Sequence, residues 1–123
     1  MTEQTALEVA TAFLNAWTGG DLAKAGSYLA EDLVFNGPIA HYTSAADFLA
    51  GSKAFVKVIQ PNWSKIAAFG DENSALLLYD LFMLSGAAMR IADYYTVSDG
   101  KIQTETILWD TYGSPFRQAK AAN

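Results

Sequence analysis

The chain has 123 residues, of which 51% are hydrophobic and 17% are charged, so we expect one globular domain spanning residues 1–123. Its net charge is −5 and its 8 Lys and Arg residues are scattered, which argues against nucleic acid and an anionic membrane surface as partners. Cysteine is absent, which excludes disulfides, thiolate nucleophiles and Cys-ligated metals.

Two helices are predicted at the N-terminus. Thr5 and Glu8 form a capping box, in which each side chain satisfies a free backbone N–H at the start of a helix. Gly19-Gly20 ends this helix, and Asp21 can cap a short second one. The apolar stripe of the first helix recurs at helical spacing and comprises Ala6, Val9, Ala10, Phe13, Leu14 and Trp17.

A short strand and a third helix follow. Leu33-Val34-Phe35-Asn36 is typical of a strand and is ended by Gly37-Pro38. A second capping box, Ser44 to Asp47, predicts the start of the third helix, which must end before Pro61.

The second half of the chain changes to β-branched and aromatic residues. Asp99-Gly100 is a strong hairpin signal, because glycine accepts the positive φ of a tight turn. The order α-α-β-α-β-β-β-β predicts an α+β fold, a curved antiparallel sheet that can enclose a cavity beneath three helices. We expect the tail to fray after about Phe116. The four predicted strands are Trp63–Phe69, Ala75–Leu84, Ala88–Val97 and Lys101–Tyr112.

Three segments resemble the nuclear transport factor 2-like superfamily, which includes ketosteroid isomerase, limonene epoxide hydrolase and the SnoaL-like polyketide cyclases. They are Gly20-Asp21-Leu22, Leu29 to Asp32, and Asp93 together with the hairpin Ser98 to Ile102. The resemblance covers about Thr5 to Phe116. It implies a cone-shaped, cystatin-like sheet around one apolar pocket.

Comparison with ketosteroid isomerase gives a partial match. Asp93 matches the isomerase's protonated aspartate, which helps to form its oxyanion hole. The isomerase's base would fall in Asn36-Gly37-Pro38, where there is no carboxylate, and its helix-one tyrosine would fall near Phe13. The resemblance therefore disfavours the isomerase mechanism.

Limonene epoxide hydrolase matches no better. A match to that enzyme would require an Arg and an Asp two residues apart on one strand. In this chain Arg90 and Asp93 are three residues apart and would face opposite ways. Its second Asp should follow a Trp by two residues, but Asp110 follows Trp109 directly. The resemblance thus leaves a SnoaL-like protein of unassigned chemistry.

Two strand carboxylates are candidate acid/base groups. Asp93 shares its face with apolar neighbours, so a position facing the cavity would raise its pKa by desolvation; the alternative is an outer-face position. The resemblance points Glu105 and Trp109 into the cavity. Glu105 could instead be solvated or salt-bridged, Trp109 could be plain core, and a bulge would reverse the faces.

Two further polar residues leave alternatives open. His41, the only histidine, is predicted in a loop that borders the cavity mouth, where it could act as a base or simply lie on the surface. Asp80 should point outward if its neighbours point to the core, while the opposite register would bury it beside Asp93.

Aromatic residues are predicted to form the pocket. Phe13, Trp17, Phe48 and Phe55 should form a roof over Asp93, since their helical stripes must pack on the sheet. The expected ligand-pocket residues are Phe13, Trp17, Tyr28, Phe55, Trp63, Tyr95 and Trp109.

Two functions remain open. The first is a cofactor-free acid/base isomerase, cyclase or hydrolase that acts on an apolar cyclic or carbonyl-bearing substrate. The second is a non-catalytic ligand-binding or dimerisation module. One histidine and no cysteine argue against a transition-metal site. We also expect a homodimer, formed through the strip Thr104, Thr106 and Leu108, and a cytoplasmic location, because no signal-peptide pattern or membrane-spanning stretch is visible.

Overall fold

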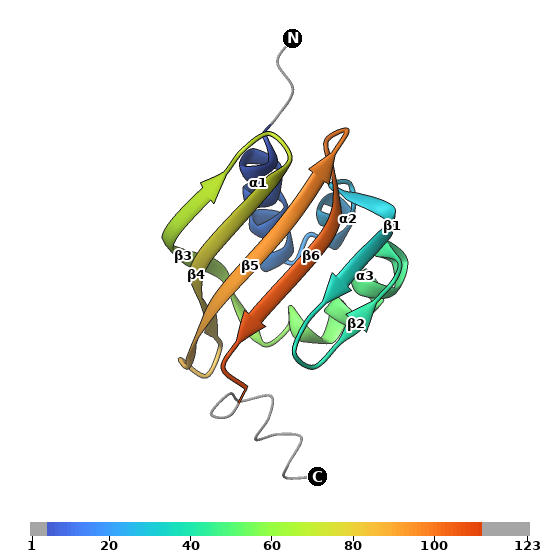
Figure 1. The fold of residues 1–123 in the computed structure, drawn as a ribbon. Helices are drawn as coiled ribbons and strands as arrows, with labels where there is room; N and C mark the ends of the chain where they lie inside the picture. The colour runs from blue at the N-terminus through green and yellow to red at the C-terminus, as the bar shows by residue number, and fades with distance from the viewer. Residues whose placement is uncertain (1–4, 112–123) are drawn as a thin grey trace.

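The computed structural model describes residues 5–111, in which three helices pack against one face of a six-stranded sheet (Figure 1). The α+β class and the order of the predicted helices and main strands are confirmed. The expectation for the tail beyond Phe116 lies outside the described residues. In chain order the elements are α1 (Ala6–Thr18), α2 (Leu22–Gly26), β1 (Leu29–Asn36), β2 (His41–Tyr42), α3 (Ala45–Phe55), β3 (Ile59–Gly70), β4 (Ser74–Met83), β5 (Ala88–Ser98) and β6 (Lys101–Trp109).

The sheet has the strand order β2-β1-β6-β5-β4-β3 and is mixed. The strands from β3 to β6 form the expected antiparallel meander. The pair β1–β6 is parallel, so the prediction of a wholly antiparallel sheet is wrong at this position. The first strand joins the sheet beside the last one, a long-range pairing on which local sequence patterns carry no information.

Helices α1 and α3 begin at the predicted capping residues, with the reciprocal capping box complete at Thr5 and Glu8 and the single N-cap bond of Ser44 at α3. The Thr5 hydroxyl accepts the Glu8 N–H at 3.2 Å, and the Glu8 carboxylate accepts the Thr5 N–H at 3.0 Å. The Ser44 hydroxyl accepts the Asp47 N–H at 3.1 Å at the start of α3. These contacts satisfy backbone donors that have no partner within the helix.

Strand boundaries differ from the predictions where tertiary pairing decides them. β1 begins at Leu29, four residues earlier than expected, because Leu29 pairs with Ile102 of β6. The loop predicted around His41 contains the short strand β2, which pairs with the end of β1. β3 begins at Ile59 and contains Pro61; it is an edge strand, where a missing N–H leaves no ladder bond unmade.

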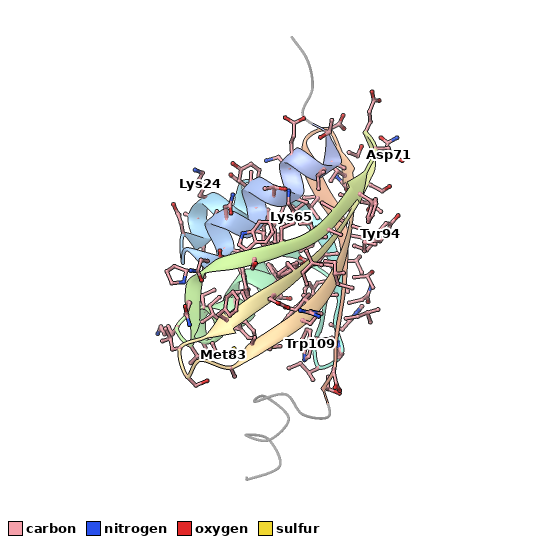
Figure 2. The ribbon with its side chains drawn as sticks, turned by 90° about the vertical axis from the view of Figure 1, so that its left-hand side faces the viewer. Lys24, Lys65, Asp71, Met83, Tyr94 and Trp109 are labelled. Atoms are coloured by element: carbon pink, nitrogen blue, oxygen red, sulfur yellow. The ribbon has the colours of Figure 1, made fainter. Side chains whose placement is uncertain are left out.

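The two faces of the sheet differ as period-2 alternation requires. On β4 the side chains of Leu77, Tyr79 and Leu81 are buried against the helices. Asp80 points to the opposite face, as predicted, where its carboxylate binds Arg90 at 3.0 and 3.1 Å. Figure 2 shows the sheet edge-on with the helices on one side only.

A bulge on β6 changes one predicted face. Thr96 pairs with Thr104 and Val97 pairs with Ile102, so Gln103 is an extra residue in the ladder. Ile102 is therefore fully buried, whereas strict alternation with Thr104, Thr106 and Leu108 would place it on the outer face. Beyond the bulge the alternation holds, and Glu105 lies on the inner face.

Within residues 5–111 no helix is both long and apolar enough to cross a membrane.

Removing the α3 cap should measurably destabilise the fold. We expect Ser44→Ala to lower the free energy of unfolding by about 1 kcal/mol, because the Asp47 N–H loses its acceptor. Ser44→Asp, which keeps an acceptor at the same position, should stay close to wild type. Urea denaturation followed by circular dichroism measures both; equal losses in the two variants would show that the cap contributes nothing.

Candidate functional site

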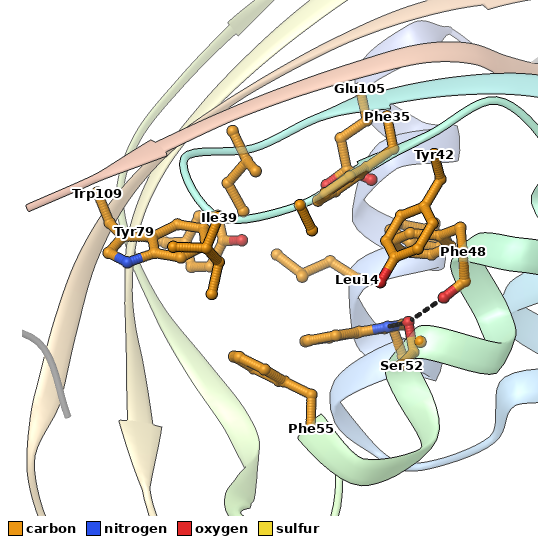
Figure 3. Close-up of a pocket in the computed structure, with 15 residues that line it drawn as sticks. Leu14, Phe35, Ile39, Tyr42, Phe48, Ser52, Phe55, Tyr79, Glu105 and Trp109 are labelled. Carbon is orange, nitrogen blue, oxygen red and sulfur yellow. Dashed lines mark hydrogen bonds between the residues drawn. The ribbon is translucent and has the colours of Figure 1, made fainter. Parts of the chain in front are cut away.

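A cavity of about 180 Å³ lies between the inner face of the sheet and helices α1 and α3 (Figure 3). Its wall is mainly aromatic. Among the described residues that line it, Glu105 is the only one with a carboxyl group, and none carries a positive charge. Ile39 and Gly51 are exposed lining residues and therefore mark its mouth. The aromatic wall comprises Phe13, Trp17, Phe35, Tyr42, Phe48, Phe55, Tyr79 and Trp109.

The helical side of the cavity is fixed by one polar link between α1 and α3. The indole N–H of Trp17 donates to the Ser52 hydroxyl at 3.0 Å, and that hydroxyl donates to the Phe48 carbonyl at 2.9 Å. The ring of Trp17 also packs on Phe55, with ring centroids 5.3 Å apart. The Trp17 donor is thus already used within the protein.

Beneath the cavity, two buried carboxyl groups meet on neighbouring strands. Asp93 is 0% exposed and Glu105 is 3% exposed. Tyr95 of β5 pairs with Glu105 of β6. Asp93 lies two residues before Tyr95 on the same face of β5, so Asp93 is the diagonal neighbour of Glu105. Each carboxyl contributes to the pKa shift of the other, so the two groups lie close together. The Tyr79 and Tyr95 hydroxyls donate to Asp93 Oδ2 at 2.9 and 2.7 Å.

The buried environment raises the pKa values of both carboxyl groups. Burial raises the pKa of Asp93 to about 6, against the opposing effect of hydrogen bonds from Glu105, Tyr95 and Tyr79. Burial and then the negative charge of Asp93 raise the pKa of Glu105 well above its ordinary value. Because two negative charges buried side by side repel each other, the pair favours a state in which the two carboxyls share one proton and carry one negative charge.

A shared proton also explains two buried oxygens. Asp93 Oδ1 and Glu105 Oε1 receive no hydrogen bond from any hydroxyl, amide or indole of the described residues. Two ionised carboxylates could not donate to each other, and two buried charges would repel. A single proton shared by two carboxyls lets one of them donate and the other accept, and so relieves both the repulsion and the missing hydrogen bonds.

The predicted pocket residues divide into two groups. Phe13, Trp17, Phe55 and Trp109 line the cavity, whereas Tyr28, Trp63 and Tyr95 do not. Tyr28 is half-buried against the core. Trp63 donates to Asn15 at 2.8 Å and packs edge-on against Tyr79, while Tyr95 lies deeper and bonds to Asp93.

The three predicted acid/base residues are only partly brought together. Asp93 and Glu105 meet, but only Glu105 reaches the cavity wall. His41 is exposed on β2, with its Nδ1 2.8 Å from Asn36 Oδ1, and it does not line the cavity. Arg90 faces away from Asp93, as predicted, and is bound to Asp80.

Tyr79 is the functional neighbour that sequence reasoning missed. Its inward direction follows from the alternation of β4, but its contact with Asp93 depends on the register of β4 against β5, in which Leu77 pairs with Asp93. The signal available in the sequence was that Tyr79 and Asp93 are polar residues on the same face of adjacent strands.

Among residues 5–111, no group of three or more His, Asp or Glu side chains could hold a metal ion.

Comparison with known proteins agrees with this geometry. The family model for the SnoaL-like domain matches residues 10–105. A solved structure from Kribbella flavida DSM 17836 is 32% identical, with a TM-score of 0.86, and the alignment covers 98% of this chain and 97% of that one. No curated protein matches the chain.

Two more distant structures share the fold. A candidate ketosteroid isomerase from Kribbella flavida DSM 17836 is 19% identical, with a TM-score of 0.77 and coverage of 89% of this chain and 81% of that one. An LEH-like epoxide hydrolase from M. tuberculosis is 18% identical, with a TM-score of 0.75 and coverage of 87% and 84%. On the family match, which spans most of the chain, the chain belongs to the SnoaL-like domain family.

Proposed function

We propose that the chain is a cofactor-independent enzyme that moves a proton on a small, neutral, carbonyl-bearing ring compound. The observation that carries this proposal is the buried carboxyl pair, one member of which faces an otherwise apolar cavity. Glu105 is the catalytic residue, and Asp93 acts through it.

The pair can act as a base although Glu105 is protonated. A C–H next to the substrate carbonyl gives its proton to the cavity-facing oxygen of Glu105, while Glu105 passes its own proton to Asp93. The electron pair of the C–H bond moves onto the carbonyl oxygen. Return of a proton from Glu105 to another carbon, with the reverse transfer from Asp93, completes an isomerisation with no net change in the pair. A pKa of about 6 at Asp93 suits this role near neutral pH.

The volume of the cavity limits the substrate. An engineered apolar cavity of roughly 150 Å³ accommodates benzene, so a cavity of about 180 Å³ encloses one ring with small substituents. Four fused rings would extend far beyond it. A single-ring substrate therefore fits better than a steroid.

Isomerisation is favoured over epoxide hydrolysis by the positions of the charged side chains. The Asp-Arg-Asp set that the sequence lacked is also missing from the cavity wall of the described residues. Arg90, the arginine that such a set would require, is bound to Asp80 on the opposite face of the sheet. The likeness to the two distant enzymes is one of fold, and it supports only the general class of pocket chemistry.

Replacing either carboxyl should abolish proton transfer without unfolding the protein. With 3-cyclohexen-1-one as the probe, we expect Glu105→Gln and Asp93→Asn each to slow conversion to 2-cyclohexen-1-one by roughly a hundredfold or more, the usual scale for one positioned acid or base. Ultraviolet absorbance of the conjugated product measures the rate. Asp80→Asn, a matched change on the outer face, should leave the rate unchanged.

The same experiment separates the alternatives. A wild-type rate in Glu105→Gln would refute the catalytic pair. Binding of the probe by wild type without turnover, and with unchanged affinity in both carboxyl variants, would instead favour a non-catalytic ligand-binding module.

The rate should rise with pH through about 6. The base form of the pair requires a negative charge on Asp93, whose raised pKa means that this charge is lost as the pH falls below about 6. We therefore expect an ascending limb in kcat/KM followed by a plateau, and loss of that limb in Asp93→Asn. A rate that fell with rising pH over the same range would contradict the base role.

A homodimer through the outer face of the sheet forms the second part of the proposal. Leu76, Tyr94 and Thr106 form one cross-strand row on this face, and Leu78, Ala92 and Leu108 form the next. Leu108 is 62% exposed and Tyr94 is 43% exposed, so the rows present a continuous apolar strip to a partner.

Light scattering tests the dimer. We expect wild type to have twice the chain mass of 13.3 kDa at micromolar concentration. Leu108→Asp should yield the monomer mass, since it places a charge in the strip. Leu84→Asp changes an equally exposed leucine outside the strip and should remain dimeric. A monomer mass for wild type would exclude the interface.

A further inference from the structure

Trp109 carries a buried hydrogen-bond donor that nothing in the described part of the chain uses. Its indole Nε1 is buried and has no acceptor, although the side chain lines the cavity. The other two indoles are paired, Trp17 with Ser52 at 3.0 Å and Trp63 with Asn15 at 2.8 Å. A buried N–H that lacks an acceptor destabilises the empty protein, so a ligand that supplies one gains affinity.

Trp109 and Glu105 lie on the same face of β6 and both line the cavity. They are four residues apart, so their backbones are separated by about 13 Å along the strand. Figure 3 shows the two side chains at separate places on the wall. One ligand atom cannot reach both groups, and each therefore binds a different part of the ligand.

From this arrangement we propose that the substrate is a single-ring compound held at two separate points, a proton-donating group bound by Glu105 and an oxygen acceptor, conjugated with that group, bound by the Trp109 N–H. This inference rests on the proposed function and adds a second binding group to it. As Glu105 takes the proton and passes its own to Asp93, the electron pair left behind is delocalised through the ring to the oxygen at Trp109. The indole N–H then holds the atom on which negative charge develops, as oxyanion donors do.

Matched probes isolate the second contact. In 4-hydroxyacetophenone a phenol lies across the ring from a carbonyl, and in 4-isopropylphenol an isopropyl group of the same shape replaces the acetyl group. We expect wild type to bind 4-hydroxyacetophenone about fivefold more tightly, the usual scale for one hydrogen bond. In Trp109→Phe the ratio of the two affinities should fall to about one, as measured by isothermal titration calorimetry.

Trp17→Phe is the control. Trp17 lines the same cavity, but its N–H is already bound to Ser52. Its replacement alters the wall for both probes, so the affinity ratio should remain at the wild-type value. A ratio that collapsed equally in both variants would show that cavity shape, and not the Trp109 donor, sets the preference.

A measurement on wild type does not depend on the variants folding. The Trp109 indole proton should move downfield in the NMR spectrum with 4-hydroxyacetophenone and not with 4-isopropylphenol. Equal affinities for the two probes and an unmoved indole resonance would overturn the two-point inference, while the proposed base pair would still be judged by its own turnover assay. Failure of both probes to bind at millimolar concentration would overturn this substrate class.

Discussion

The close approach of the two buried carboxyls, Asp93 and Glu105, is the interaction on which the site depends. Burying two carboxyl groups is costly unless they share a proton and their remaining oxygens find donors. The hydroxyls of Tyr79 and Tyr95 supply two donors to Asp93, and the shared proton supplies the third. These four side chains come from β4, β5 and β6, so the antiparallel register of the meander fixes the chemistry beneath the cavity.

Local chemistry in the sequence predicted much of the fold. The caps at Thr5 and Ser44 and the Asp99-Gly100 hairpin depend on neighbouring residues alone, and all three are present. The parallel pairing of β1 with β6 and the bulge at Gln103 depend on contacts between distant segments. A pattern of period 2 contains neither, which is why the sequence predicted an antiparallel sheet without the β1–β6 pair and could not locate the bulge.

The sequence predicted which face of the sheet each site residue occupies, but not which side chains that residue contacts. Alternation along β5 turns Asp93 inward and Arg90 outward, and both orientations follow from spacing. The depth of each side chain does not: Trp63 and Tyr95 pack below or beside the cavity, and His41 lies on the exposed strand β2. Depth depends on helix packing and strand register together, which no single stretch of sequence determines.

The outward position of Arg90 also fixes which molecules the cavity can admit. The described wall contains no Lys, Arg or His, and a negative charge lies directly beneath it on Asp93. Carboxylate or phosphate groups would lose water in this environment and meet a like charge, with no cation to offset either effect. Most soluble metabolites carry such anionic groups. The strand alternation that turns Arg90 outward therefore leaves a described cavity wall that favours uncharged small molecules over anionic ones.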